Sequence, residues 1–280
     1  MSLYLEVERV AIWSLVTFMQ KGSLVCVGTG MTLGSHISPL SRSYIEQADV
    51  VFVLVADGTT ELWIQSMNAD VRSLQPYYCE GQSRMITYQQ MVAAILAEVH
   101  AGKKVCGAFY GHPGVFAWVP HQAIKEAVAA GYRAHMEPGI SAEDCLYADL
   151  GLDPGTYGCQ HYEASNLMFY QRTIDTAAYL ILWQPGVAGD KSLAKFSTGS
   201  AYREVLVELL SQWYPLDHQV ILYEAVTLPI QQPRIEPIAL SDLPKAQMDL
   251  KTTLVIPPAT VAKANRVILD QLNILAAQEN

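Results

Sequence analysis

The residues best suited to chemistry are an arginine and three tyrosines in the stretch QPYYCEGQSRMITYQQM, where Tyr77, Tyr78 and Tyr88 surround Arg84. Tyrosines that pack in a core would give the same pattern. A cation beside a phenol, however, stabilises the phenolate and lowers a pKa that begins at about 10. The stretch therefore predicts either a tyrosine base or a stabiliser for an oxyanion.

A second candidate is the turn YGHPGVF, which runs from Tyr110 to Phe116 directly after an apolar stretch. Two glycines around Pro113 make a rigid turn that carries backbone N–H and C=O groups to the end of a strand. Ligands of α/β sheets bind at the carboxyl ends of strands. The turn is typical of a site for an adenosine-bearing ligand held largely by main chain, and an ordinary strand-to-helix loop is the alternative.

The segment EPGISAEDC indicates a capped helix, with Ser141 as the cap and Asp144 three residues later. The first-turn N–H groups of such a helix attract a carboxylate. A methionine-type carboxylate on the same ligand would fit there, although any capped helix shows this pattern.

The glycine cluster VGTGMTLG contains Gly28, Gly30 and Gly34. A dinucleotide fingerprint places its third glycine one residue earlier and ends the next strand on an acidic residue. Asp49 precedes the next apolar run and Asp57 comes late. A plain tight turn explains the cluster as well as a nicotinamide cofactor does.

Composition narrows the classes of function. The chain has 280 residues, is 51% hydrophobic and carries a formal net charge of -9, so it can bury a large core. It lacks the basic face that nucleic-acid binding requires, since its densest basic cluster is Lys103 and Lys104. Five cysteines without a CxxC pair indicate a reducing cytoplasm. The histidine spacing predicts no metal site.

Short β-branched runs alternate with helical patterns, which predicts an α/β fold with a parallel first sheet. Expected strands are Ser23–Gly28, Val50–Val55, Lys104–Phe109 and Tyr132–Met136. Expected helices are 38–48, 87–101, 120–129 and 141–150. In the helix 87–101, Thr87 and Gln90 form a capping box, Met91, Ile95 and Val99 form one face, and Gly102 ends it.

The second half indicates a mixed or antiparallel sheet. Its strand-like pieces lie near His161, Ala178–Trp183, Gln219–Thr227 and Thr252–Ile256, and a last helical pattern covers 260–277. Residues 1–21 are expected to form a helical extension, unless translation starts further on. The apolar run Val10–Met19 is shorter than the about 20 residues that span a bilayer, so no membrane association is expected.

Taken together, these motifs resemble the tetrapyrrole methylase superfamily, from about Gly22 to Pro258. The resemblance implies an α/β, two-domain tetrapyrrole methylase-like fold with the active site in the cleft. The implied parts are an extension 1–21, a parallel-sheet N-terminal domain 22–137, a mixed-sheet C-terminal domain 138–258 and a helix 259–280. Porphyrin-modifying members carry GAGPGDP where this chain has GTGMTLG, which disfavours a tetrapyrrole substrate.

The likeness is greater to borosin-type peptide backbone α-N-methyltransferases. It rests on VGTG, SYIEQADVVF, the spacing from Arg84 to Tyr88, YGHPGVF, EPGISAEDCL and YLILWQPGVAGD. The resemblance implies S-adenosylmethionine as the methyl donor. It implies a donor pocket lined by Tyr110, His112, Val115, Phe116, Ser141, Ala142, Gln184 and Ala225. It implies catalysis by Arg84, Tyr88 and Tyr110, with Tyr78 in support.

The chain ends at Asn280 without a recognisable core peptide, as in the split bacterial form, in which a separate precursor peptide is methylated. The expected partners are that peptide and a second copy of the chain, as a homodimer or as a heterotetramer with two precursor peptides. The alternatives are a methylase of the same fold for a tetrapyrrole or another small molecule, and an inactive peptide-binding homologue.

Overall fold

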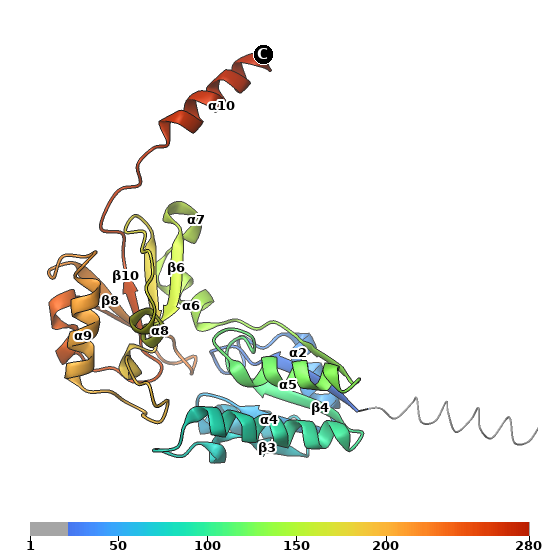
Figure 1. Cartoon of the computed structure of the whole chain (residues 1–280). Coiled ribbons are helices and arrows are strands. Elements are labelled where there is room, and N and C mark those ends of the chain that lie inside the picture. Colours follow the sequence, from blue (N-terminus) through green and yellow to red (C-terminus); the bar gives the residue numbers. More distant parts are fainter. Residues whose placement is uncertain (1–21, 280) are drawn as a thin grey trace, which may run out of the picture. The chain divides into compact units, whose positions relative to one another are not determined.

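A computed structural model describes residues 22–279, which divide into two compact units. The first unit consists of the described chain up to Leu152 and of two later segments, Asp190–Phe196 and Glu224–Arg234. The second takes Asp153–Gly189, Ser197–Tyr223 and the chain from Ile235 onward. In Figure 1 the first unit runs mainly from blue to green and the second from yellow-green to red. The extension expected at 1–21 lies outside the described residues.

The first unit is built on a parallel five-stranded sheet with the order β3-β2-β4-β1-β5. Its strands are β1 (Ser23–Gly28), β2 (Val50–Leu54), β3 (Val71–Ser73), β4 (Lys104–Phe109) and β5 (Arg133–Met136). The register pairs Gly28 with Phe109, so β1 and β4 end side by side. Four of these strands were predicted, whereas β3 is too short to give a pattern.

Both faces of this sheet are buried, as continuous apolar strands require. Leu24 and Cys26 of β1 pack on the face covered by α4 (Arg84–His100) and α5 (Trp118–Ala129). Val25 and Val27 pack on the opposite face, with α2 (Pro39–Gln47) and α3 (Gly58–Gln65). The connections that follow β1 and β4 thus lead to opposite faces of the sheet.

Helix α4 begins earlier than the sequence pattern indicates. Its N-cap is Ser83, and the predicted capping box of Thr87 and Gln90 is wrong. The Thr87 hydroxyl instead donates to the carbonyl oxygen of Tyr77, 3.1 Å away, and the Thr87 side chain is buried. The predicted apolar face is confirmed, and Gly102 follows the helix with a φ of 88°. Helix α6 (Ala142–Leu150) has the predicted Ser141 cap.

The second unit holds a mixed sheet with the order β6-β7-β10-β8-β9. Strand β6 runs parallel to β7, and β10 is antiparallel to both β7 and β8. The strands are β6 (Cys159–Glu163), β7 (Tyr179–Trp183), β8 (Gln219–Glu224), β9 (Arg234–Ala239) and β10 (Thr253–Ile256). The predicted fold class, with a parallel first sheet and a mixed second sheet, is confirmed. Strand β9 was missed because it is largely exposed and contains Pro237.

The second unit also contains α7 (Pro154–Tyr157), α8 (Ala164–Phe169), η2 (Pro185–Val187), α9 (Ser200–Leu210), η3 (Leu240–Lys245) and α10 (Arg266–Gln278). Leu206 and Leu210 of α9 are fully buried against this sheet's core. The last helix begins six residues later than its pattern predicted.

The first unit extends to Leu152, whereas the sequence placed a boundary between 137 and 138. Within residues 22–279, no helix has the length and apolar character needed to cross a membrane.

Candidate active site

Three glycine turns meet at the carboxyl ends of β1, β4 and β5. A Cβ atom on Gly28 would lie 2.7 Å from the Cα of Gly139 and would collide with the carbonyl oxygen of Gly111. A Cβ on Gly139 would meet the same carbonyl and would lie 2.8 Å from the Cα of Gly28. The turns VGTG, YGHPG and EPG therefore pack backbone against backbone, which only glycine allows.

The first two turns are also joined by hydrogen bonds. The N–H of Gly111 donates to the carbonyl of Gly30 over 2.9 Å, and the N–H of Gly30 donates back to Gly111 over 3.2 Å. Both glycines have positive φ, 73° at Gly30 and 63° at Gly111. The bridge lies where the chain leaves β1 and β4 for opposite faces of the sheet, the position at which α/β folds bind ligands.

The rest of YGHPGVF is a tight loop with defined internal bonds. The N–H of Gly114 donates to Nδ1 of His112 over 2.9 Å, and Nε2 of His121 lies 2.9 Å from the Gly114 carbonyl. Phe116 is 52% exposed and has a φ of 48°. A positive φ at a bulky residue costs energy and is typical of functional loops.

Tyr78, Tyr88 and Tyr110 come together beside Arg84 in the first unit. The rings of Tyr78 and Tyr88 meet edge to face at 6.4 Å, and Tyr88 stacks on Trp118 at 6.2 Å. Tyr110 follows β4, and its N–H donates to the carbonyl of Leu54 over 3.0 Å. The structure thus brings the four predicted catalytic residues into one group.

The phenols of this group differ in their tendency to ionise. Burial raises the pKa of Tyr78 well above its usual range, and the ionised forms of Tyr88 and Tyr110 raise it further. A hydrogen bond with Tyr88 also favours the protonated Tyr78 phenol, while the charge of Arg84 opposes these effects. Burial of the phenol and an ionised Tyr88 raise the pKa of Tyr110, although 50% of that residue's surface is exposed. Tyr78 and Tyr110 therefore stay protonated at neutral pH.

Arg84 is fixed by a segment that sequence reasoning missed. Its backbone N–H donates to the carbonyl of Leu193 and its Nη1 to the carbonyl of Lys195, each over 2.8 Å. Both carbonyls belong to the returning segment Asp190–Phe196. The motif PGVAGD ends on Asp190, which was the available signal, but nothing local indicated that this loop returns to Arg84.

At Ser141 the structure shows the predicted cap in detail. The N–H of Ser141 donates to Oδ2 of Asp144 over 2.7 Å, and the Asp144 N–H donates to Oγ of Ser141 over 3.3 Å. The Asp144 carboxylate thus binds the N–H of the cap residue, while the expectation of a ligand carboxylate concerns the first-turn N–H groups that begin at Ala142. Ser141 is buried and lies near Gly111, and Ala142 begins α6.

The two remaining donor-pocket candidates lie in later segments. Ala225 belongs to the returning segment Glu224–Arg234, which is held to the loop after β1. There the Thr32 hydroxyl donates to the Val226 carbonyl over 3.2 Å, and Leu33 N–H donates to the carbonyl of Thr227 over 2.9 Å. Gln184 lies in the second unit before η2, with a φ of 54°.

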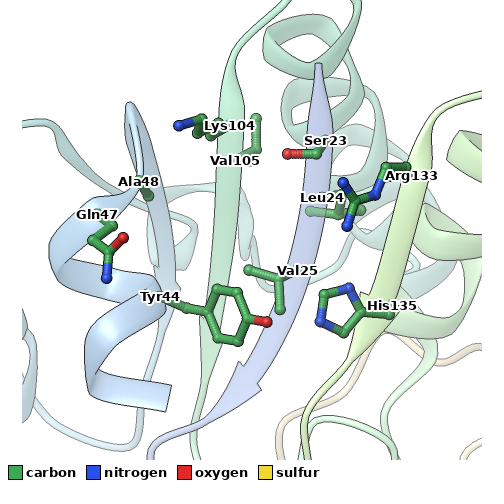
Figure 2. Close-up of a pocket in the computed structure, with 10 residues that line it drawn as sticks. All are labelled: Ser23, Leu24, Val25, Tyr44, Gln47, Ala48, Lys104, Val105, Arg133 and His135. Atoms are coloured by element: carbon green, nitrogen blue, oxygen red, sulfur yellow. The ribbon is translucent and has the colours of Figure 1, made fainter. Parts of the chain in front are cut away.

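A cavity of about 200 Å³ lies away from this group, at the other end of the strands. Figure 2 shows Tyr44 of α2 and His135 of β5 facing each other across Val25, with ring centroids 5.5 Å apart. Its wall includes Ser23, Lys104 and Arg133, which begin β1, β4 and β5. The cavity is therefore a partly uncovered patch of sheet remote from the glycine turns.

The part of the chain that the structure describes contains no group of three or more His, Cys, Asp or Glu side chains able to hold a metal ion.

Comparisons with known proteins agree with this geometry. The chain is 40% identical over 269 residues to "Methyltransferase/ribosomally synthesized cyclic peptide gymnopeptides precursor" of Gymnopus fusipes, covering 94% of this chain and 64% of that protein. It is 40% identical over 267 residues to "Methyltransferase/ribosomally synthesized type I borosin cyclic peptide precursor" of Coprinopsis marcescibilis, covering 92% of this chain and 68% of that protein. The chain thus spans about two thirds of these relatives.

A solved structure shows the same fold. The X-ray structure of the cobalamin biosynthetic enzyme cobalt precorrin-4 methyltransferase aligns with a TM-score of 0.58 at 16% identity, covering 84% of this chain and 94% of that one. The model of the Tetrapyrrole (Corrin/Porphyrin) Methylases matches residues 23–241. The predicted resemblance is confirmed, and the chain belongs to the tetrapyrrole methylase family and has relatives named as borosin methyltransferases.

Proposed function

We propose that this protein is an S-adenosylmethionine-dependent methyltransferase that N-methylates backbone amides of a separate, ribosomally made precursor peptide. The observation that carries the proposal is the group of Tyr78, Tyr88 and Tyr110 beside Arg84, in the unit that also holds the glycine turns. Relatives named as methyltransferases of ribosomal cyclic peptide precursors support a peptide substrate.

The glycine turns suit the donor. They bring the backbones of Gly28, Gly111 and Gly139 into contact at the carboxyl ends of β1, β4 and β5. Backbone groups at that end of a sheet favour a ligand recognised largely through main-chain groups. The residues of the first unit that are proposed to hold the donor are Tyr110, His112, Val115, Phe116, Ser141, Ala142 and Ala225. When bound, S-adenosylmethionine supplies a methyl group activated by its positively charged sulfur.

The peptide nitrogen presents the chemical difficulty, because its lone pair is delocalised into the carbonyl. Tyr88 is proposed to act as its phenolate, which accepts the amide proton and becomes a neutral phenol. The positive charge of Arg84 and the protonated Tyr78 phenol, which shares a hydrogen bond with Tyr88, would favour that phenolate. A bound donor would supply its methyl group to the deprotonated nitrogen and would be left as a neutral thioether. The proton remains on Tyr88 until solvent removes it.

Tyr110 has the properties of a hydrogen-bond donor. The raised pKa keeps its phenol protonated, and half of the residue's surface is open to solvent. A protonated phenol at that place would donate to the amide oxygen as negative charge develops on it. Donors that are already oriented toward such charge give large rate effects.

The test is to incubate the protein with S-adenosylmethionine and the candidate precursor peptide and to locate new methyl groups by tandem mass spectrometry. We expect methyl groups on backbone nitrogens. Methylation confined to side chains or to an added tetrapyrrole would contradict the proposal. Calorimetry with the donor alone tests the other alternative, since an inactive peptide-binding protein would bind the peptide without heat from the donor.

The proposal includes an assembly of two copies, either alone or with two precursor peptides. Light scattering on the purified protein, with and without the peptide, measures the mass of the particle. We expect the mass of two chains, raised by that of two peptides on mixing. A monomer in both samples would refute the assembly while leaving the chemistry testable.

A further inference from the structure

The loop Asp190–Phe196 is organised around one buried carboxylate. Asp190 is 3% exposed. Its Oδ1 accepts hydrogen bonds from the N–H and the hydroxyl of Ser192, over 3.0 and 2.5 Å. Its Oδ2 accepts from the N–H of Lys195 over 2.9 Å. A carboxylate with several such donors fixes the backbone of a loop.

The carbonyl groups of this loop point at the start of α4. The Leu193 carbonyl accepts from the N–H of Arg84, and the Ala194 carbonyl accepts from the N–H of Gly81 over 3.2 Å. The Lys195 carbonyl accepts from Nη1 of Arg84. Leu193 has a φ of 55°, a costly conformation for a residue with a branched side chain. The surrounding hydrogen bonds therefore hold the loop in the conformation in which its carbonyl groups accept from Arg84.

The guanidinium that this loop holds acts on the Tyr78 phenol. The charge of Arg84 lowers the pKa of Tyr78, against the effects of burial and of the other tyrosines. The orientation of the Arg84 guanidinium depends on the Lys195 carbonyl, because that carbonyl accepts a hydrogen bond from Nη1 of Arg84. The N–H of the same Lys195 residue donates to Asp190. One carboxylate is thus connected to the catalytic arginine through a single residue's backbone.

We propose that Asp190 is a positioning residue that orients the Arg84 guanidinium toward the tyrosine group by fixing the carbonyls of Leu193 and Lys195. The inference rests on the proposed function only for its kinetic consequence. Its structural part concerns the free protein.

The ionised carboxylate is required for this arrangement, because only an oxygen that accepts can meet each of these donors. Burial by itself would raise the pKa of Asp190. The hydrogen bonds from the Ser192 hydroxyl and from the N–H groups of Lys195, Ser192 and Ala194 outweigh burial and lower the pKa. Asp190 is therefore charged at the pH of any ordinary assay.

The first experiment is kinetic and uses the Asp190→Asn variant. Asparagine keeps the size of the side chain but replaces one acceptor by a donor, which opposes the Lys195 N–H. We expect kcat to fall by about ten- to a hundredfold, because displacing a catalytic group by about 1 Å can cost about a hundredfold in rate. The peptide KM and the donor affinity should change less than about twofold, because uniform binding is untouched.

The second variant separates positioning from general damage. If Asp190 acts through Arg84, then Asp190→Asn should cost almost nothing further in an Arg84→Lys background, since the guanidinium is already absent. The proposal would be overturned if the kcat losses of the two single variants multiplied in the double variant. A loss of donor binding in Asp190→Asn as large as its loss of kcat would also overturn it. Asp153→Asn makes the same substitution at the exposed N-cap of α7 in the second unit and should leave kcat unchanged, since asparagine also caps helices.

The third measurement is independent of any substrate. Hydrogen exchange read by mass spectrometry should show faster exchange of the Gly81 and Arg84 amides in Asp190→Asn, because their acceptors lie in the freed loop. Unchanged exchange at both amides would refute the positioning role. If exchange rises while the unaltered protein methylates no peptide, the proposed function fails and the positioning role stands.

Discussion

The proposed chemistry depends on one phenol oxygen, that of Tyr88. The ring of Tyr88 stacks on Trp118 and meets Tyr78 edge to face, so Tyr88→Phe keeps the packing and removes only the oxygen. We expect methylation to fall by about a hundredfold or more, the usual effect of losing a general base, while donor affinity measured by calorimetry is unchanged. Tyr77→Phe is the matched control and should retain activity. Full activity of Tyr88→Phe would exclude Tyr88 as the base.

The phenol of Tyr78 gives a prediction for high pH. Burial raises its pKa in the folded protein, so the unfolded chain gives up this proton first as the pH increases. The stabilising contribution of Tyr78 is complete below about pH 10, the ordinary pKa of tyrosine, and is lost as the pH rises toward the folded value. Absorbance titration of the phenols should show one fewer late-ionising group in Tyr78→Phe. An unchanged late phase would show that Tyr78 ionises normally.

Among the structural elements, the junction of β1, β4 and β5 is expected to be sensitive to mutation. A Cβ at position 28 meets backbone of two other turns, which cannot move aside as a flexible side chain can. We expect Gly28→Ala to destabilise the protein by about 1–3 kcal/mol, as overpacking does, and to weaken donor binding. Denaturant unfolding and calorimetry measure the two effects.

Gly58 provides the control for this substitution. It begins α3, and a Cβ there has no neighbour within 4 Å. Gly58→Ala should be neutral or stabilising by up to about 1 kcal/mol, because alanine loses less chain entropy on folding. Equal destabilisation by both substitutions would show that the contact at Gly28 is not the cause.

For the molecule as a whole, the cysteines report on folding. Burial raises the pKa values of the Cys26 and Cys106 thiols, which lie inside the first sheet, whereas Cys79 is exposed. Because the thiolate is the reactive form, iodoacetamide should modify Cys79 first and should reach Cys26 and Cys106 only when the first unit unfolds. Peptide mapping along a denaturant series measures this order. Labelling of Cys26 as fast as Cys79 in native buffer would contradict the described core.

Elements with local signals could be predicted from the order of the amino acids. The strands β1 and β4 have their predicted bounds, and α6 has its predicted cap, because apolar periodicity and capping involve residues only a few positions apart. The glycine turns at the strand ends were recognisable for the same reason. The family motifs also named Arg84, Tyr88 and Tyr110, which the fold brings together.

Features that join distant parts of the chain became visible only in the folded protein. Helix α4 begins at Arg84 instead of Thr87 because the carbonyl of Leu193 supplies an acceptor for the Arg84 N–H. No periodicity relates these two positions, and the left-handed backbone at Leu193 has no signature in its residue type. The contact of Gly28 with Gly139 likewise follows from the strand order. Hydrogen bonds between near neighbours are determined by local sequence, whereas those between distant segments depend on the topology that brings them together.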